Sequence, residues 1–393
     1  MKVMFVFDGI GIGGIERVGV DYVNLLAEKG HNVYVINLNP KRTELVQEIS
    51  DRCTIRAFKF SRSIVYYRYQ KLVENGFWGI LGYLLLLIIL TPVSYFAKLL
   101  FRLNNLDVGS FDCLIAMSGH YNDLFFTANN YANTKNKVAW LHGAEFEYGL
   151  LSGGYFSLYK RIKNLVCLSE MCDSVCQSFN KRYSIKKTKI YNPIKINDRV
   201  LNEYLVQELK NKYQDFALMV GRMNKDKDQE TVIRAMRIVN SQYAPKHLLF
   251  VGDGPSRGKL ELLVKELNMD EYIHFIGNQI DVQNYYEAAA IYVHSSPMEG
   301  LPTVLLEAMS YKKPIASTDS IPGVREILGN EDCGLISPVG DAVALANNII
   351  RLYEDYELKM RLINRGQIRI KDFQPEKSIT ALEKFLNFEG KET

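Results

Sequence analysis

Short apolar runs alternate with amphipathic stretches along almost the whole chain. Near the start, Lys2–Phe7 has the pattern of a strand and Ile15–Lys29 that of a helix. Such alternation is typical of a parallel sheet covered by helices. The same reasoning predicts further strands of this sheet at Asn32–Leu38, Asp112–Met117, Lys137–Leu141 and Asn164–Leu168.

The alternation pauses at Tyr191–Ile194, a plausible hinge, and then restarts. A length of 393 residues suits two domains of about 150–200 residues each. We therefore predict an N-terminal Rossmann-like domain over residues 1–195 and a second Rossmann-like domain over residues 196–374. Residues 375–393 are expected to form a C-terminal helix that could return to the first domain. The second sheet is predicted to hold strands at Phe216–Val220, His247–Val251, Tyr272–Ile276, Ala290–His294, Pro314–Ser317 and Gly334–Ser337.

One segment departs from this pattern, because residues 75–97 contain no charged side chain. A helix of that length could span a bilayer, but a single crossing would separate strands of one sheet. Thr91–Pro92 also interrupts the apolar run. We therefore predict a membrane-docking segment at about residues 75–102 that lies in the interface, while burial in the domain core and a true span remain alternatives. Basic residues that could meet anionic head groups are Arg62, Arg68, Lys71, Lys98 and Arg102.

The net charge of +4 is distributed unevenly. Residues 1–195 hold 24 Lys and Arg against 15 Asp and Glu, whereas residues 196–393 hold 24 against 29. The basic half suggests an anionic partner, such as a phosphate-bearing acceptor or an acidic lipid surface; no nucleic-acid partner is expected.

The first apolar run is too short for a signal peptide, and the six cysteines form no C-x-x-C pair. Both features favour a reducing, cytoplasmic location.

The stretch with the most candidate ligand-binding residues is a strand-to-helix turn, Pro297–Met309. Pro302 suits the start of a helix, because its missing N–H would have no intrahelical partner there. The free N–H groups at Thr303 and its neighbours, together with the helix dipole, predict a phosphate site. Glu299 precedes this helix and Glu307 lies in its second turn. Two carboxylates so placed could bind hydroxyl groups at either end of a diphosphate.

A second turn, after the predicted strand Phe216–Val220, is rich in glycine and charge. Arg222 and Lys227 could clamp a pyrophosphate. Asp226 and Asp228 match the D-x-D pattern of metal-dependent transferases, but so short a pattern arises often by chance. We therefore expect no metal site here.

Other strand ends carry weaker signals. The glycine loop Asp8–Arg17 lacks the G-x-G-x-x-G spacing, and no acid ends the following strand, which disfavours a dinucleotide-dependent dehydrogenase. His142 ends a predicted strand, where ligands bind in open α/β sheets, and is the best catalytic candidate among six histidines. Gly252–Pro255 and Gly323–Glu326 are two more strand-end turns.

Taken in order, these motifs resemble the retaining glycosyltransferases of family 4, including those of bacterial surface-polysaccharide synthesis. The resemblance is densest from Asn192 to about Asp341. That family carries a Gly-Arg turn with a lysine six residues after the glycine, a G-D-G-P turn, an E-G-x-P-x-x-x-x-E-A motif and a G-x-x-E helix start. This sequence matches them at Gly221–Lys227, Gly252–Pro255, Glu299–Ala308 and Gly323–Glu326, with support from Gly13–Arg17 and His142. The resemblance implies an α/β, GT-B fold: two Rossmann-like domains facing each other across a cleft. It also implies that the domain over residues 1–195 binds the acceptor and that the domain over residues 196–374 binds the nucleotide sugar.

The resemblance also implies residue roles. Arg222 and Lys227 would neutralise the donor diphosphate, Glu307 would hold the ribose and Glu299 the donor sugar. His142 would contact the sugar near its reacting carbon. The implied catalytic residues are His142, Arg222, Lys227 and Glu299. The implied donor-binding residues are Gly13, Gly14, Arg222, Lys227, Gly252, Asp253, Glu299, Gly300, Leu301, Pro302, Thr303 and Glu307. No metal or other cofactor is expected, since the nucleotide sugar is a substrate.

Two positions depart from the family pattern. Asp228 stands where the family often has glycine, and Ile321-Pro322 replaces a common small residue before Gly323. Neither change removes a charged contact, but each leaves the local loop geometry open.

The predicted function is transfer of a sugar from a nucleotide-diphosphate sugar, with UDP-sugars favoured, to a lipid-linked or saccharide acceptor. The enzyme would be a metal-independent, hexosyltransferase-type protein of cell-surface polysaccharide biosynthesis, peripheral on the inner face of the cell membrane. Alternatives are a GT-B nucleotide-sugar epimerase or hydrolase, or a catalytically silent binding subunit of a transferase complex.

Overall fold

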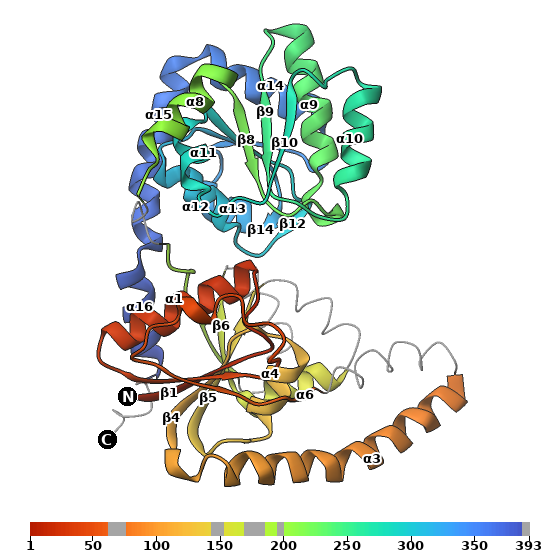
Figure 1. The fold of residues 1–393 in the computed structure, drawn as a ribbon, viewed down its shortest axis with the longest axis vertical. Coiled ribbons are helices and arrows are strands. Elements are labelled where there is room, and N and C mark those ends of the chain that lie inside the picture. Colours follow the sequence, from red (N-terminus) through yellow and green to blue (C-terminus); the bar gives the residue numbers. More distant parts are fainter. Residues whose placement is uncertain (62–75, 143–152, 169–184, 195–199, 387–393) are drawn as a thin grey trace. The chain divides into compact units, whose positions relative to one another are not determined.

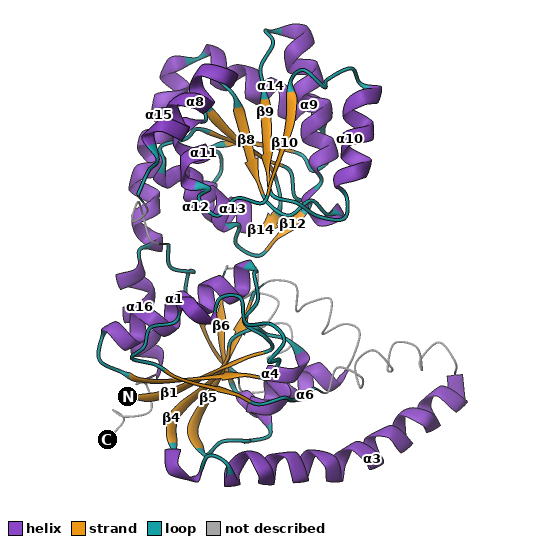
Figure 2. Ribbon diagram, in the orientation of Figure 1, coloured by secondary structure: helices purple, strands orange, loops and turns teal. Residues whose placement is uncertain are grey.

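The computed structural model describes residues 1–61, 76–142, 153–168, 185–194 and 200–386. Contacts divide the chain into two compact units. Unit 1 contains Met1–Pro193 together with Pro375–Thr393, and unit 2 contains Ile194–Gln374. Each unit has a parallel sheet covered by helices, so the predicted α/β class is confirmed (Figures 1 and 2).

Unit 1 is built on a seven-stranded parallel sheet with the order β3-β2-β1-β4-β5-β6-β7. The inner strand β1 is buried on both faces, as its continuous apolar run requires. The strands are β1 (Lys2–Phe7), β2 (Asn32–Asn37), β3 (Thr54–Ala57), β4 (Phe111–Ala116), β5 (Thr134–Leu141), β6 (Asn164–Cys167) and β7 (Lys186–Lys189). The helices are α1 (Gly14–Glu28), α3 (Gly76–Leu103), α4 (Tyr121–Ala128), α6 (Gly153–Ile162) and α16 (Pro375–Leu386).

The C-terminal helix α16 is part of unit 1 and packs beside α1. Leu382 is buried there, and Glu383 pairs with Lys29 at 2.9 Å and with His31 at 2.8 Å. Ser378 Oγ donates to the Tyr191 carbonyl at 2.8 Å. The last helix of the chain therefore completes the first unit.

Unit 2 repeats the same arrangement with the strand order β10-β9-β8-β11-β13-β15. In each sheet the order reverses beside the first strand, between β1 and β4 and between β8 and β11. Ligands of doubly wound folds bind outside the carboxyl ends of the strands at such a switch point. The strands are β8 (Ala217–Val220), β9 (Leu248–Val251), β10 (Ile273–Gly277), β11 (Ile291–His294), β13 (Ile315–Thr318) and β15 (Leu335–Ser337). The helices are α8 (Glu203–Tyr213), α9 (Gln229–Gln242), α10 (Arg257–Glu266), α11 (Gln283–Ala288), α12 (Thr303–Ser310), α13 (Gly323–Leu328), α14 (Ala342–Glu354) and α15 (Tyr356–Arg369).

Every strand predicted from an apolar run is present, but two strands of the first sheet, β3 and β7, were missed. Both lie at an edge of the first sheet, and their sequences, T-I-R-A and K-K-T-K, are short and polar. Edge strands of this kind are common, because charged side chains there discourage pairing with other chains.

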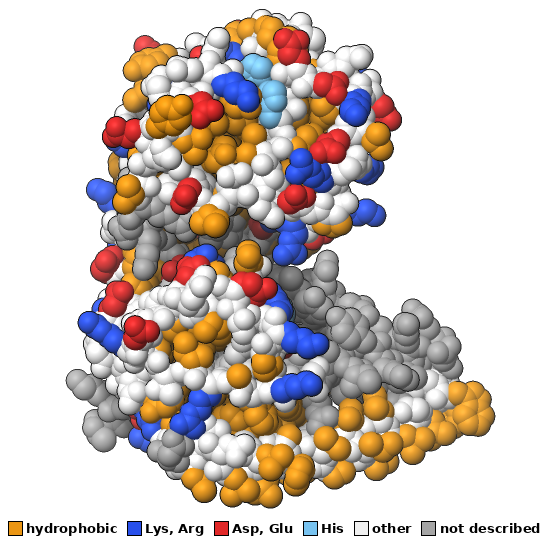
Figure 3. All heavy atoms as spheres, viewed as in Figure 1, with side chains coloured by type: hydrophobic (Ala, Val, Ile, Leu, Met, Phe, Trp, Pro, Cys, Tyr) orange, Lys and Arg blue, Asp and Glu red, His pale blue; other side chains and the backbone are white. Residues whose placement is uncertain are grey.

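The uncharged segment forms the single helix α3, which continues through Pro92. The expectation that Thr91-Pro92 interrupts this segment is wrong, because the helix is continuous there. The burial alternative is also wrong for this helix, because Phe77, Trp78, Ile88 and Ile89 are 63–76% exposed (Figure 3). By length and composition α3 could cross a membrane.

The hydrogen bonds that join α3 to other described residues of unit 1 include several from its C-terminal part. Phe101 is buried in the core, Lys98 Nζ donates to the Asn129 carbonyl at 2.8 Å, and Arg102 donates to the Asn130 carbonyl at 3.0 Å. In Figure 1 the N-terminal part of α3 extends away from the sheet of this unit. The other predicted flanking residues, Arg62, Arg68 and Lys71, lie outside the described residues.

Candidate functional site

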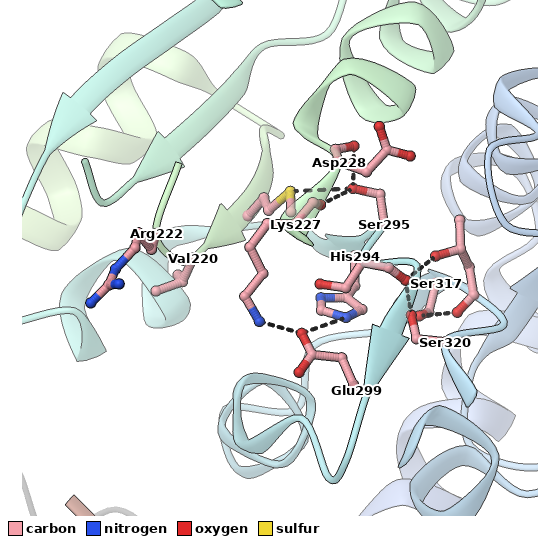
Figure 4. A network of polar contacts seen from close by, with 12 residues as sticks. Val220, Arg222, Lys227, Asp228, His294, Ser295, Glu299, Ser317 and Ser320 are labelled. Atoms are coloured by element: carbon pink, nitrogen blue, oxygen red, sulfur yellow. Dashed lines mark hydrogen bonds and ion pairs between the residues drawn. The ribbon is translucent and has the colours of Figure 1, made fainter. Parts of the chain in front are cut away.

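The candidate site of unit 2 lies at the switch point of its sheet, where β8 and β11 end side by side. The loop after β8 supplies Lys227, and the loop after β11 supplies Glu299. The Lys227 ammonium forms an ion pair with Glu299 Oε1, and both side chains are more than two-thirds buried (Figure 4). Two residues predicted from separate motifs are thus brought together.

The backbone around Glu299 is held by an unusual local pairing. Met298–Glu299 (β12) pairs in parallel with Ile321–Pro322 (β14), and Glu299 lies opposite Pro322. A Cβ atom on Gly323 would lie 2.6 Å from Pro302 Cδ and 2.7 Å from the Gly300 carbonyl oxygen. Only glycine therefore allows the G-x-x-E helix to approach the loop that carries Glu299.

His294 belongs to this cluster and was not identified as a site residue from the sequence. It ends β11, is 1% exposed, and its Nε2 lies 3.8 Å from Glu299 Oε1. Neither ring nitrogen has a hydrogen-bond partner among the described residues. Burial lowers the pKa of His294 to about 4, although the charge of Glu299 opposes the shift. The ring is therefore neutral at pH 7, and the available signal was a lone histidine closing an otherwise apolar strand.

The loop that carries Lys227 is fixed to β11 by Ser295. The Ser295 hydroxyl lies 2.9 Å from the Lys227 carbonyl and 2.7 Å from the Asp228 carbonyl. Asp228 has φ +47°, a left-handed conformation that glycine adopts at less cost, which accounts for the family's preference for glycine here.

The D-x-D carboxylates are engaged within their own loop. Asp226 accepts from Asn224 Nδ2 at 3.0 Å, and Asp228 accepts from the Thr231 hydroxyl at 2.6 Å. Across the described residues, no three or more His, Cys, Asp or Glu side chains gather in a group that could hold a metal ion.

Arg222 is not brought together with Lys227. Its side chain is exposed and points away from the Lys227–Glu299 pair in Figure 4, while its carbonyl accepts from Gln229 Nε2 at 3.0 Å. A pyrophosphate clamp that uses both cations would require Arg222 to change rotamer.

Helix α12 begins at Thr303, directly after Pro302. Its first backbone hydrogen bond joins the Leu305 N–H to the Pro302 carbonyl, so the N–H groups of Thr303 and Val304 precede the intrahelical ladder. Leu301 is buried beneath this turn. Such a helix start offers N–H donors and a positive dipole end to an anion.

Glu307 lies on the same helix, half-buried beside Tyr286. Burial, reinforced by the charge of Glu307, raises the pKa of the Tyr286 hydroxyl well above its usual range. Tyr286 is therefore neutral and can donate a hydrogen bond to the carboxylate. Glu307, the second predicted glutamate, therefore lies within helix α12.

The predicted donor residues Gly252 and Asp253 have clear structural roles. A Cβ atom on Gly252 would lie 2.1 Å from the Gly221 carbonyl oxygen, so glycine is needed for the two loops to pack. Asp253 accepts from the Gly254 N–H at 2.7 Å and from Arg257 Nη1 at 3.1 Å.

The remaining predicted residues, Gly13, Gly14 and His142, belong to unit 1. Gly13 is the N-cap of α1, and Gly14 begins that helix. His142 follows β5, and its Nε2 donates to the Met117 carbonyl at 2.7 Å. Burial lowers the pKa of His142 to about 4, so this ring is also neutral at pH 7.

The match to a known family falls on the unit that holds the Lys227–Glu299 pair. Residues 202–369 match the family of glycosyl transferases group 1. The match covers most of unit 2. The matched range includes every unit 2 residue predicted to bind the donor.

Similar proteins span the full chain. An uncharacterised glycosyltransferase of Haemophilus influenzae is 24% identical over 386 residues, covering 96% of this chain and 98% of that protein. A Campylobacter jejuni protein is 24% identical over 383 residues, covering 95% of each chain. It is named GalNAc-alpha-(1->4)-GalNAc-alpha-(1->3)-diNAcBac-PP-undecaprenol alpha-1,4-N-acetyl-D-galactosaminyltransferase.

Solved structures share the fold. Anabaena HepE, crystallised with UDP, has a TM-score of 0.76 at 17% identity, covering 99% of this chain and 100% of that one. The predicted GT-B fold is thereby confirmed. The fold, the match of residues 202–369 to the group 1 family and the similarity to glycosyltransferases over almost the whole chain together support a GT-B glycosyltransferase.

Proposed function

We propose that the protein transfers a sugar from a nucleotide-diphosphate sugar, with UDP-sugars favoured, by the metal-independent, retaining chemistry of glycosyltransferase family 4. The observation that carries the proposal is the arrangement at the switch point of unit 2. One lysine and a helix start offer positive charge, while Glu299 and Glu307 offer carboxylates to hydroxyl groups. These are the groups that recognise a diphosphate between two sugars.

In this reaction the bond between the anomeric carbon and the diphosphate oxygen breaks, and a bond to the acceptor oxygen forms. Negative charge develops on the departing phosphate, where Lys227 and the N–H groups of α12 would stabilise it. The acceptor would approach from the side of the leaving group, which accepts the hydroxyl proton. Glu299 would hold the donor sugar and is not assigned as a nucleophile.

The acceptor we favour is a lipid-linked saccharide of cell-surface polysaccharide synthesis. The Campylobacter relative is named for an undecaprenol-diphosphate substrate, and unit 1 carries the exposed apolar helix α3. With its apolar side chains in a bilayer, α3 would hold the protein as a peripheral enzyme on the inner face of the cell membrane.

The experiment that tests this function measures transfer of radiolabelled glucose, galactose, GlcNAc and GalNAc from their UDP-sugars to a bacterial lipid extract. Incorporation of label into the organic phase without added metal is expected, with loss of about a hundredfold in Lys227→Ala. Lys225→Ala, in the same loop but exposed, is the matched control. Turnover that does not depend on the extract would instead support an epimerase or hydrolase, and no turnover would support a silent binding subunit.

A further inference from the structure

The switch point of the first sheet carries a polar cluster that none of the predicted donor residues belongs to. Asp8 directly follows β1, and residues 118–122 follow β4. The two strands are parallel neighbours, with Val6 opposite Ala116, so their carboxyl ends lie at the same end of the sheet. This is the position in unit 1 that corresponds to the Lys227–Glu299 pair in unit 2.

The Asp8 carboxylate is held in one orientation. Its backbone N–H donates to the Ser118 hydroxyl at 3.0 Å, and Asn122 Nδ2 lies 2.9 Å from Oδ1 and 3.0 Å from Oδ2. The side chain nevertheless remains 19% exposed. A fixed, partly exposed carboxylate is suited to accept a hydrogen bond from a ligand.

His120 completes the cluster from the cap of α4. Its Nδ1 lies 3.7 Å from Asp8 Oδ2, and its side chain is 38% exposed. That separation exceeds a direct hydrogen bond, but a single oxygen atom about 2.8 Å from both atoms fits between them. A hydroxyl group meets both requirements, because it can donate to the carboxylate and accept from the ring.

A second carboxyl group, Asp123, lies behind Asp8. Asp123 is fully buried, its Oδ2 accepts from the Gly119 N–H at 3.0 Å, and its Oδ1 has no hydrogen-bond partner among the described residues. Burial and the charge of Asp8 raise its pKa well above the usual range. Asp123 is therefore the buried, structural member, and Asp8 is the carboxyl group that a ligand can reach.

We propose that Asp8 and His120 bind a hydroxyl group of the acceptor saccharide, with Asn122 as a positioning residue. The proposal rests on the proposed function, since it assigns the acceptor side of the same reaction. A carboxylate, an amide and an imidazole at one edge favour a hydroxyl-rich ligand. A phosphate group would instead meet the negative charge of Asp8.

A competing explanation is that Asp8 only braces the ends of β1 and β4. The chain offers a matched control, because Asp112 joins the same two strands at their amino-terminal ends. Its Oδ2 accepts from the Lys2 N–H at 2.9 Å, and its Oδ1 lies 3.4 Å from Lys135 Nζ. Asp112→Asn therefore tests the effect of removing a bracing carboxylate from this sheet.

The experiment compares full-length wild type, Asp8→Asn, His120→Ala and Asp112→Asn. Saturation-transfer NMR would measure binding of the octyl glycosides of glucose, galactose, GlcNAc and GalNAc in the presence of UDP. Calorimetry would measure the affinities for UDP and UDP-glucose, and thermal unfolding would report stability.

We expect at least one glycoside to bind wild type and Asp112→Asn, and to bind Asp8→Asn and His120→Ala about tenfold more weakly or not at all. UDP affinity should be unchanged in all four proteins. Equal glycoside binding in Asp8→Asn, or no binding to a wild type that binds UDP, would overturn the inference. Weaker binding of UDP-glucose but not UDP in Asp8→Asn would also overturn it, by assigning the site to the donor sugar. A wild type that fails to bind UDP would instead count against the proposed function.

Discussion

At the scale of single residues, Lys227 has two potential partners. It forms an ion pair with Glu299, while the proposed reaction requires the same ammonium group to neutralise a diphosphate. A nucleotide that binds Lys227 must therefore compete with the Glu299 carboxylate. A bound sugar would offset this competition by giving Glu299 hydroxyl groups to accept from.

This competition predicts opposite effects of Glu299→Gln on binding and on transfer. UDP should bind about three- to tenfold more tightly, because one partly buried ion pair no longer competes for Lys227. Sugar transfer should fall, because an amide is a weaker acceptor for the donor hydroxyls. Calorimetry and the transfer assay measure the two effects, with Glu266→Gln, at an exposed position of α10, as control. Weaker UDP binding in Glu299→Gln would contradict this account.

His294 predicts a dependence of stability on pH. Its folded pKa is about 4 and its unfolded pKa about 6.5, so the unfolded state binds more protons between these values. The contribution is complete above pH 6.5 and is lost as the pH falls toward 4, at roughly 1.4 kcal/mol per pH unit.

His294→Leu removes this titration and should make the unfolding temperature fall less steeply between pH 7 and pH 5 than in wild type. Differential scanning calorimetry of both proteins between pH 7 and pH 5 measures the unfolding temperature. If the unfolding temperature fell equally steeply with pH in both proteins, His294 would not titrate as its burial requires.

Motifs in the sequence were sufficient to single out Lys227, Glu299 and Glu307 as candidates, and the structure brings Lys227 and Glu299 together. The sequence was insufficient for His294, because its role depends on burial and on the loop that Ser295 holds beside it. It also gave no indication that the Arg222 side chain points away from Lys227. Side-chain direction depends on tertiary contacts that one motif does not encode.

At the scale of elements, α3 exposes many apolar side chains. Two of its hydroxyl groups are satisfied within the helix, since Thr91 Oγ1 donates to the Leu87 carbonyl at 2.7 Å and Ser94 Oγ to the Leu90 carbonyl at 2.8 Å. Polar groups in hydrocarbon require such internal partners. The helix also tolerates Pro92, which composition alone had suggested would interrupt the run.

Changing Leu84, Leu85, Ile88 and Ile89 to Gln should abolish membrane binding while leaving UDP affinity unchanged. The reason is loss of apolar area available to the bilayer, at about 25 cal/mol per Å². Flotation with vesicles that contain anionic lipid measures the effect. The control changes four exposed apolar residues of unit 2 to Gln: Leu262, Ile280, Val343 and Ile368. Equal flotation of the α3 variant and wild type would contradict membrane docking by this helix.

At the scale of the whole molecule, the same strand order occurs twice, and each switch point holds a cluster of charged and polar side chains. The apolar runs were sufficient to predict two parallel sheets, because buried parallel strands read as continuous hydrophobic segments. The edge strands β3 and β7 carry no such signal. Their pairing is set by the sheet already formed beside them.

The central claim is that the switch point of unit 2 binds a nucleoside diphosphate without a metal. Its most direct test is calorimetric titration of UDP, with GDP in parallel, into the full-length protein in the presence of EDTA, beside Glu307→Ala. The account predicts that wild type binds one nucleotide, with UDP favoured, and that Glu307→Ala binds it at least tenfold more weakly because a ribose contact is lost. Binding of neither nucleotide, or equal binding by the variant, would contradict it.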